Sequence, residues 1–462
     1  MTVDKVLESN KINNESLHLI KTGKNFLGIL NDLKRRPEDA ARELNVPLEQ
    51  INAIIEGKKS LPSEIIESAT KIWPVNPSDF YVIRDDSPTG VKIMSAEESK
   101  KTSRVMNRAG KPYYEYRDTV MSDVAPFRPE WIKQLCVVND NDPENPMVRW
   151  NNGHFMHQFT YFIGNVNFYY IDEDGKKQTA IMKTGDSMYI TPFVPHTFAT
   201  RKNSNKNGLI LALTYGDKLT GEIKQELASL ATELASQFSL DFSTRENGSA
   251  SLLKFHRQIS SLTVNEVSRR TKLSIETIHD LENAKRLPST EEIVLLANAF
   301  NVNTRELISN DKVEKKVIIK SSEDCKKWGY PEESQNYEFI ELASTSSLPF
   351  SKTFEIKVQN SNNEDYDLIA GLHQFVYNVG NDELLLNWEL DGKKYTKSIK
   401  PGYSAYIKPF IRHNFSGSGN LVVLRIGGKI PGDSQRELSM FGAKNLSRVI
   451  AETALWFNPH RK

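Results

Sequence analysis

Two histidines and a glutamine in the first half of the chain have the types and spacing of a metal site. His154 and Gln158 are four residues apart, and His196 follows a turn that contains two prolines. In a β-strand alternate side chains share a face, so His154 and Gln158 are predicted to point one way and His157 the other. His196 is expected to begin the strand that returns across them. Two imidazoles and one amide oxygen would then occupy one face of a metal ion and leave positions open, as in non-heme Fe(II) sites that react with dioxygen.

The same pattern occurs a second time, without the first histidine. The segment 373–381 repeats the order of residue types in 157–165, and Asp-Gly pairs, a Gly-led strand and a final histidine follow in both halves. In the second copy Gln374 and His413 are present, but Ala370 stands where the first histidine would be. Because two neutral ligands hold a metal poorly, the second copy is predicted to be structural.

Each copy is preceded by a segment with helical periodicity. Apolar residues recur at three- and four-residue spacing from Phe26 to about Phe80 and from Leu253 to about Leu307, which predicts two small helical bundles. Pro47 and Ser274 are each predicted to precede the second helix of a helix-turn-helix. The polar segment 240–249 is the expected linker.

Alternating apolar and aromatic residues predict short strands in the segments that follow, such as 166–171 and 384–390. Asp-Gly at 174–175 and at 391–392 predicts hairpins. The expected fold class is α+β, a tandem repeat of a helix-turn-helix-like unit followed by a cupin-type jelly-roll β-barrel. The predicted boundaries are 1–82 for the first helical domain, 83–238 for a catalytic barrel, 239–312 for the linker and second helical domain, and 313–462 for a degenerate structural barrel.

Composition excludes several classes of protein. The 462 residues include 60 Lys plus Arg and 59 Asp plus Glu, so no global charge favours nucleic acid or an anionic membrane. Two cysteines make neither a disulfide framework nor a thiolate metal cluster. The first residues lack the order of a secretory signal, and the sequence has no apolar run long enough to cross a membrane. We therefore expect a cytoplasmic protein with no membrane partner.

These residues together resemble the phosphonate-processing non-heme iron oxygenases, over nearly the whole chain. The resemblance rests on the helix-turn-helix plus barrel order, on His154-x3-Gln158 and on the segment Gly185–His196. Some members of that family place a glutamate four residues after the first histidine, and others place one six residues before the last. Here these positions hold Gln158 and Ile190, and Ile190 cannot bind a metal. The resemblance therefore implies one Fe(II) per chain, held by two histidines and a glutamine, as in the methylphosphonate-forming members.

The resemblance also implies a site for the phosphonate substrate. Arg108 lies in a segment like the family's phosphonate-binding stretch, and Asn151 resembles its substrate-binding asparagine. A phosphonate dianion needs charged, directional donors, which Arg108 can supply, while Tyr116 and Asn151 add neutral hydrogen bonds. Tyr114 is a candidate catalytic residue. Lys34 lies near the position of the family's active-site lysine, which reaches into a barrel from a helical domain, and is a candidate for both catalysis and substrate binding.

The function implied is Fe(II)- and O2-dependent conversion of 2-hydroxyethylphosphonate to methylphosphonate, with carbon–carbon cleavage and CO2 as co-product. The alternative within the family is a dioxygenase that yields hydroxymethylphosphonate plus formate. Packing around Ile190 and Met188 is a candidate cause of the difference. Barrels of this class commonly self-associate, so a homo-oligomer is expected.

An alternative from another class is a ligand-sensing transcription regulator, which shares the helix-turn-helix plus barrel plan. Gln50 and Asn52 could read bases from the first predicted recognition helix. That helix also carries Glu49 and Glu56, however, where DNA phosphates would lie, and the second predicted recognition helix is similarly acidic. We therefore expect no nucleic-acid partner.

Overall fold

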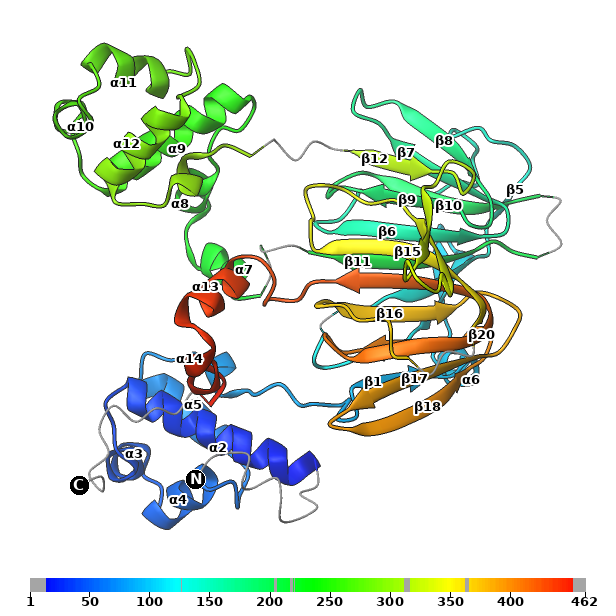
Figure 1. Ribbon diagram of the computed structural model, residues 1–462, viewed down its shortest axis with the longest axis horizontal. Helices are drawn as coiled ribbons and strands as arrows, with labels where there is room; N and C mark the ends of the chain where they lie inside the picture. Colours follow the sequence, from blue (N-terminus) through cyan, green and yellow to red (C-terminus); the bar gives the residue numbers. More distant parts are fainter. Residues whose placement is uncertain are drawn as a thin grey trace.

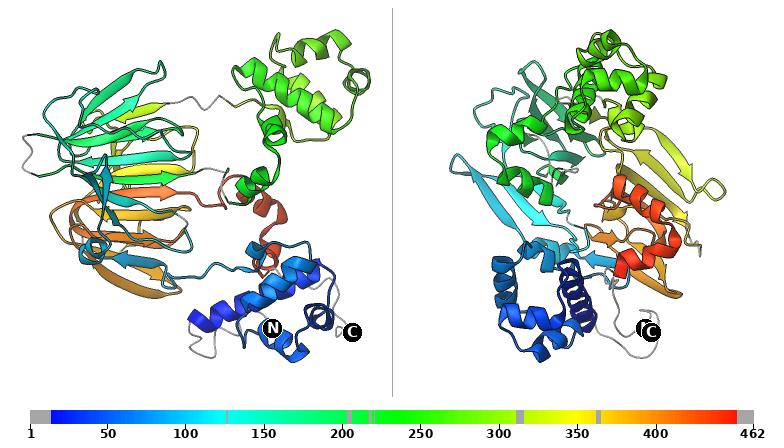
Figure 2. Two further views of the ribbon diagram at one scale, coloured as in Figure 1. Left: turned by 180° about the vertical axis from the view of Figure 1, so that it is seen from behind. Right: turned by 90° about the vertical axis from the view of Figure 1, so that its left-hand side faces the viewer.

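The computed structural model describes residues 14–125, 127–202, 206–216, 219, 221–310, 316–361 and 365–451. Figure 1 shows two helical units on one side of a body of antiparallel strands. Short helices α7, α8, α13 and α14 lie between the two helical units (Figures 1 and 2). Their bounds are Glu222–Ser229, Thr232–Ala235, Asp433–Phe441 and Ala443–Ala451, with the 3₁₀ helix η2 (Ser236–Phe238) after α8. Among the described residues no helix is both long enough and apolar enough to cross a membrane.

The first helical unit packs short amphipathic helices around an apolar core that includes Phe26 and Ile51. Its helices are α2 (Asn14–Asp32), α3 (Pro37–Leu44), α4 (Leu48–Ile55), α5 (Ser63–Ile72) and the 3₁₀ helix η1 (Pro77–Phe80). Asn45 ends α3 in the left-handed conformation, with φ of 53°, which turns the chain sharply toward α4. Pro47 is the N-cap of α4, so the predicted start of this helix is confirmed.

The second helical unit repeats this arrangement around Leu253 and Val267. Its helices are α9 (Arg245–Ile259), α10 (Val264–Thr271), α11 (Ile275–Glu282), α12 (Thr290–Phe300) and the 3₁₀ helix η3 (Thr304–Leu307). Ser274 caps α11 as predicted, because its hydroxyl accepts the Thr277 N–H. The predicted linker 240–249 needs a correction, since the Thr244 side chain caps α9 and residues 245–249 belong to that helix, which leaves only 240–243 outside a helix.

The first β unit consists of two facing sheets. Their strand orders are β12-β9-β6-β11-β4-β3-β2 and β5-β10-β7-β8. The strands are β2 (Arg104–Arg108), β3 (Lys111–Asp118), β4 (Glu130–Gln134), β5 (Val137–Val138), β6 (His157–Ile163), β7 (Val166–Ile171), β8 (Lys177–Met182), β9 (Ser187–Ile190), β10 (His196–Arg201), β11 (Leu209–Tyr215) and β12 (Val317–Lys320). A core that includes Phe162, Phe168 and Phe198 joins the two sheets. The predicted strand 166–171 and the hairpin at 174–175 are confirmed.

The second β unit has the strand order β1-β19-β16-β20-β15-β14-β13, with β17 and β18 pairing beside the first part of β20. The strands are β1 (Val91–Met94), β13 (Lys327–Tyr330), β14 (Tyr337–Glu341), β15 (Ser351–Ser361), β16 (His373–Asn378), β17 (Leu384–Leu390), β18 (Lys393–Ile399), β19 (Ser404–Ile407) and β20 (Arg412–Ile426). The short helix α6 (Ala96–Lys101) follows β1. The predicted strand 384–390 and the hairpin at 391–392 are confirmed.

The two halves of the chain exchange one strand each. β1 precedes the first β unit in the sequence but pairs with β19 of the second, and β12 follows the second helical unit but pairs with β9 of the first. The predicted range 83–238 therefore includes a strand of the second unit, and 313–462 includes a strand of the first. Sequence periodicity marks a strand without naming its partner, which is why the boundaries missed the exchange.

A shared apolar core joins the two β units face to face. It contains Phe159 and Tyr189 from the first unit and Phe375 and Tyr406 from the second. The exchanged strands and this core bind the two units into one body (Figure 1). Each of these strands has a second face, opposite the shared core, that points into the interior of its own unit. Gln158 lies on this second face.

Candidate metal and substrate site

His154 and Gln158 face one another, as the sequence predicted, although His154 does not lie in a strand. Gln158 is the second residue of β6, and His154 lies in the loop before it. His154 Nε2 is 3.0 Å from Gln158 Oε1. His157 points to the other side, where its ring contacts the Tyr189 hydroxyl. The prediction that His154 and Gln158 share a face is therefore confirmed. His154 reaches that face from a loop, although the sequence predicted that it would do so from a strand.

His196 begins β10, as expected, and its ring meets that of His154 almost at right angles. The two ring centroids are 5.2 Å apart and the planes make an angle of 86°. The loop before β6 packs tightly against the turn before β10, because the Phe193 N–H donates to the His154 carbonyl at 2.8 Å. Gly153 permits this approach, since a Cβ there would lie 2.7 Å from the Phe193 carbonyl carbon, and its φ is 75°.

Backbone carbonyls hold both imidazoles in the tautomer that can bind a metal. His154 Nδ1 is 2.9 Å from the Met156 carbonyl oxygen, and His196 Nδ1 is 2.9 Å from that of Val194. A carbonyl only accepts, so each Nδ1 carries a proton, and in the neutral ring each Nε2 then presents a lone pair. Burial is the main cause that lowers the pKa of His196 to about 4, and the nearby side chains of His154 and Arg108 contribute to the same shift. His196 is therefore neutral near pH 7.

The residues fit a metal ion on a direct physical test. The Gln158 amide nitrogen donates to Thr160 Oγ1 at 2.9 Å, which turns Oε1 toward His154 Nε2. Two acceptor atoms 3.0 Å apart are held together by a shared cation, which is either a proton on His154 Nε2 or a metal ion bound by both atoms. Among the described residues, no group of three His, Cys, Asp or Glu side chains could hold a metal, so a metal bound by the two histidines would take its third protein ligand from the Gln158 amide. Ile190, opposite Gln158 on β9, is fully buried and supplies no ligand.

Arg108 lies close to the two histidines at the end of β2. Its guanidinium carbon is 5.0 Å from the Tyr113 ring centroid and 4.8 Å from that of Tyr114. It donates to Thr197 Oγ1 at 3.1 Å and to the carbonyl of Arg149. These contacts hold the positive charge beside β10, where an anion bound next to His196 would meet it.

The two candidate tyrosines differ in what their hydroxyls do. The Tyr114 hydroxyl accepts the Phe198 N–H at 2.9 Å and lies 2.9 Å from Thr197 Oγ1, so it positions β10. Burial raises the pKa of Tyr114. The Tyr116 hydroxyl has no hydrogen-bond partner among the described residues, and burial raises its pKa to about 12. Tyr116 thus remains protonated and available as a donor.

Asn151 joins the site through its side-chain amide. Its oxygen accepts the His196 N–H at 2.8 Å and the Gly153 N–H at 3.0 Å. Its nitrogen is therefore turned toward His196 Nε2, at 3.3 Å. Asn151 thus lies between the loop and β10, beside the lone pair that a metal would use.

Lys34 is not brought to this site within the chain. It lies in the turn after α2, and its Nζ donates to the Asp32 carbonyl at 2.9 Å. Figure 1 shows the first helical unit beside β1, β17 and β18, at the end of the molecule away from β6 and β10. The helical unit that precedes a β unit in the sequence is thus not its neighbour in space.

Sequence reasoning did not single out Thr160 and Thr197. Thr160 is two residues after Gln158 on β6, so it shares the face of Gln158 and orients its amide. Thr197 receives the side chains of Arg108, Tyr113 and Tyr114. The i, i+2 spacing could have identified Thr160, but nothing in the sequence marks Thr197.

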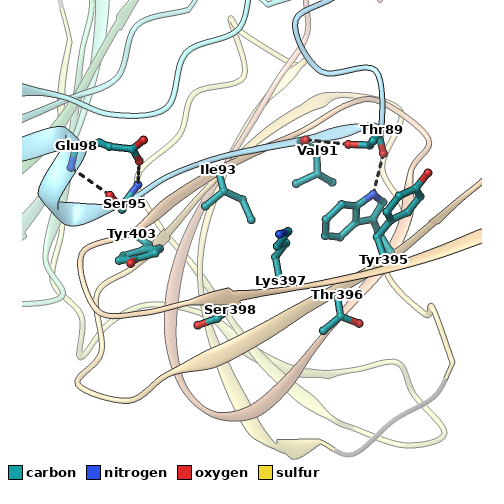
Figure 3. A pocket seen from close by; sticks show the side chains of 11 residues that line it. Thr89, Val91, Ile93, Ser95, Glu98, Tyr395, Thr396, Lys397, Ser398 and Tyr403 are labelled. Atoms are coloured by element: carbon teal, nitrogen blue, oxygen red, sulfur yellow. Dashed lines mark hydrogen bonds between the residues drawn. The ribbon is translucent and has the colours of Figure 1, made fainter. Parts of the chain in front are cut away.

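A cavity of about 500 Å³ lies elsewhere, at the open edge of the second β unit between β1 and β18 (Figure 3). Ser95, Glu98, Lys397 and Tyr403 are among the residues that line it. Trp388 also lines it and donates its indole N–H to the Thr89 carbonyl at 2.7 Å. The cavity has no histidine in its lining and is separate from the site at His154.

Known proteins are similar to this chain in sequence and in fold. A helix-turn-helix domain model matches residues 250–313. Methylphosphonate synthase of Nitrosopumilus maritimus (strain SCM1) is 59% identical over 442 residues, which are 96% of this chain and 96% of that protein. The 2-hydroxyethylphosphonate dioxygenase of Streptomyces viridochromogenes is 22% identical over 430 residues, 86% of this chain and 89% of that one.

A solved structure is similar along almost the entire chain. It is the Streptomyces albus HEPD with 2-hydroxyethylphosphonate and Fe(II) bound, and it has a TM-score of 0.87 with 33% identity. The match covers 96% of this chain and 99% of that one. Fold and similarity define the protein as an enzyme of the mononuclear non-heme iron oxygenase class. Within that class, the chain belongs to the phosphonate oxygenase family that contains methylphosphonate synthase.

Proposed function

We propose that the protein converts 2-hydroxyethylphosphonate and O2 to methylphosphonate, CO2 and water, using one Fe(II) per chain. The observation that carries the proposal is the placement of His154 Nε2 and Gln158 Oε1 3.0 Å apart, next to a neutral His196. A two-histidine, one-glutamine set without a carboxylate is what the resemblance to the methylphosphonate-forming members implied. The relative at 59% identity carries that activity in its name.

The proposed metal ligands are His154 Nε2, Gln158 Oε1 and His196 Nε2. When bound, Fe(II) supplies open coordination positions and the one-electron chemistry that reaction with dioxygen requires. The protein's part is to keep both imidazoles neutral and correctly turned. Because all three ligands are neutral, the site keeps the full metal charge and attracts a dianionic substrate more strongly than a site with a glutamate would.

The proposed phosphonate contacts are Arg108, Tyr116 and Asn151. Arg108 provides charged donors next to β10, and Tyr116, whose ring lies against that of Tyr114, provides an uncommitted hydroxyl. Asn151 offers an amide N–H beside His196. Together they would fix the phosphonate end, so that the hydroxyl-bearing carbon lies on the metal side. Tyr114 supports this arrangement by holding Thr197 and the backbone of β10.

Lys34 remains a proposed catalytic and substrate-binding residue. Within one chain it lies at the wrong end of the molecule (Figure 1). A second copy of the chain is therefore the source from which its ammonium group would reach the site. This fits the expectation of a homo-oligomer, and a mixed oligomer of a Lys34→Ala chain with a His154→Ala chain would test it by recovery of activity.

The finer fold assignment is also a proposal. We infer two cupin-type jelly-roll barrels in tandem, each preceded by a helix-turn-helix unit, with β1 and β12 exchanged between them. Support comes from the strand orders, which are the same in both β units when β1 is matched with β12, β19 with β9 and β16 with β6. The cytoplasmic location expected from the sequence stays a prediction.

The product decides between the two activities of the family. Protein loaded with Fe(II) is given 2-hydroxyethylphosphonate in air, and the products are followed by phosphorus NMR. A phosphorus signal coupled to a methyl group is expected. Hydroxymethylphosphonate as the sole product would assign the protein to the dioxygenases, and an unreacted substrate would contradict both. Ile190→Glu, which adds a carboxylate opposite Gln158, tests whether packing at Ile190 directs the outcome.

Transcriptional regulation is the second candidate, because a helix-turn-helix model matches residues 250–313. Acidic residues of the second helical unit neutralise most basic side chains near its recognition helix α11. The pairs are Arg269 and Arg270 with Glu266, Lys285 with Asp280, and Arg286 with Glu292. This arrangement opposes phosphate contacts. A salt-sensitive mobility shift on duplex DNA would support regulation, and iron-dependent oxygen uptake with 2-hydroxyethylphosphonate would support catalysis.

A further inference from the structure

The second β unit keeps most of the proposed metal geometry of the first. His413 Nδ1 is 2.9 Å from the Ile411 carbonyl oxygen, just as His196 Nδ1 meets that of Val194. The Phe410 N–H donates to the Ala370 carbonyl at 2.8 Å, just as the Phe193 N–H donates to His154. Ala370 is therefore the spatial counterpart of His154, as the sequence repeat indicated.

A guanidinium group stands beside these residues. In the first unit Gln158 lies opposite Thr214 on the neighbouring strand, and in the second Gln374 lies opposite Arg425. Arg425 Nε donates to Gln374 Oε1 at 2.9 Å, which is the oxygen that corresponds to the proposed ligand atom Gln158 Oε1. Cross-strand partners share a face, so the arginine points into the mouth of the unit.

Aromatic rings hold Arg425 in place where a buried cation would otherwise lack support. Its guanidinium carbon is 5.7 Å from the Phe339 ring centroid and 5.3 Å from that of Phe354. Within the described part of the chain, Arg425 makes no ion pair with a carboxylate. Phe339 corresponds by strand register to Tyr116. Burial and the charge of Arg425 also lower the pKa of His413.

We propose that Arg425 is a built-in replacement for the metal ion: its guanidinium takes the metal's place between Gln374 and His413 and closes a latent metal site. The second unit then needs two changes to bind a metal, namely Ala370→His to restore the ligand and Arg425→Thr to remove the cation. This inference goes beyond the proposed function, but it takes its ligand geometry from the proposed first site.

Cobalt(II) binding tests the proposal without any turnover. In a His154→Ala/His196→Ala background, which removes the first site, Ala370→His alone and Arg425→Thr alone are expected to bind no cobalt. The two combined should bind about one ion per chain with the absorption spectrum of nitrogen and oxygen ligands. Ala370→His with Arg425→Lys keeps a cation in place and should bind none. Cobalt should raise the melting temperature of the Ala370→His/Arg425→Thr combination only.

The outcomes separate this proposal from the proposed function. If the unsubstituted protein binds no cobalt and the background substitutions change nothing, the first site is wrongly assigned. If that protein binds cobalt but the combined variant does not, the Arg425 proposal is wrong, and it is equally wrong if Ala370→His alone binds the ion. Should Arg425→Thr unfold the protein, Arg425→Met keeps the contacts with Phe339 and Phe354 and answers the same question.

Discussion

The two β units share the order of seven strands, but they differ in the group that lies next to the glutamine side-chain oxygen, Gln158 in the first unit and Gln374 in the second. In the first, Gln158 Oε1 lies 3.0 Å from His154 Nε2, and these are two of the three proposed metal ligands. In the second, Gln374 Oε1 accepts a hydrogen bond from Arg425, so the protein provides the positive charge itself. The comparison teaches that the residue opposite the glutamine on the neighbouring strand, Thr214 in the first unit and Arg425 in the second, decides whether a protein cation lies beside the amide oxygen.

The largest expected difference between the two units comes from their final histidines. His196→Ala should lose bound iron. Loss of a residue that only hydrogen-bonds to a metal ligand typically costs about 10- to 100-fold in activity, and His196→Ala should reduce turnover by more than that. The matched change His413→Ala should leave turnover and iron content within about twofold, because it touches only the second unit. Metal analysis and phosphorus NMR measure both. Equal losses from the two variants would break the comparison.

The exchanged strand makes the first unit depend on the second half of the chain. The Thr191 N–H bonds to the Lys316 carbonyl, and hydrogen-bonded pairs alternate along an antiparallel ladder, so Ile318 opposite Tyr189 is also such a pair. Ile318→Pro should lower the free energy of unfolding by about 1–3 kcal/mol, because a ladder donor is lost. Ile319→Pro, at a non-bonded position, should cost less. Urea unfolding measures both, and the reverse order would contradict the observed register.

A substitution at Arg108 tests whether substrate binding in the first unit needs the guanidinium group or only its positive charge. Arg108→Lys keeps the charge but loses the planar fork, so KM for 2-hydroxyethylphosphonate should rise about tenfold with a smaller change in kcat. Arg104→Lys is the control, because Arg104 lies on the same strand and pairs with Asp118 and Glu130. Steady-state kinetics at fixed salt measure both. An unchanged KM for Arg108→Lys would remove this residue from the site.

A pH dependence of stability is expected from the second unit. Burial lowers the pKa of His373 to about 4, below its ordinary value of 6.5. The unfolded chain therefore binds more protons between these values, and stability falls as pH drops from 6.5 to 4, by up to about 1.4 kcal/mol per pH unit. His373→Gln should flatten this slope in urea unfolding series. A slope unaffected by the substitution would mean that His373 titrates normally.

Local patterns were enough to predict the helical units, the hairpins and the face shared by His154 and Gln158. Helix caps such as Pro47 and Ser274, and Asp-Gly turns, act over a few residues, so a sequence displays them directly. The spacing of His154 and Gln158 was also informative, although His154 reaches its position from a loop. Side-chain chemistry and short-range geometry carried these predictions.

Only the tertiary structure decided which distant parts meet. Arg425 contacts Gln374 because β16 and β20 pair in one particular register, and a one-residue slip would turn the arginine outward. The exchange of β1 and β12, and the position of Lys34 away from the site, likewise depend on which edges and faces are packed together. The sequence itself determined the candidate ligands, the duplication and the missing histidine at Ala370. Strand pairing joins residues far apart in the chain through backbone hydrogen bonds that any sequence can make. Local sequence patterns therefore do not predict which strands pair.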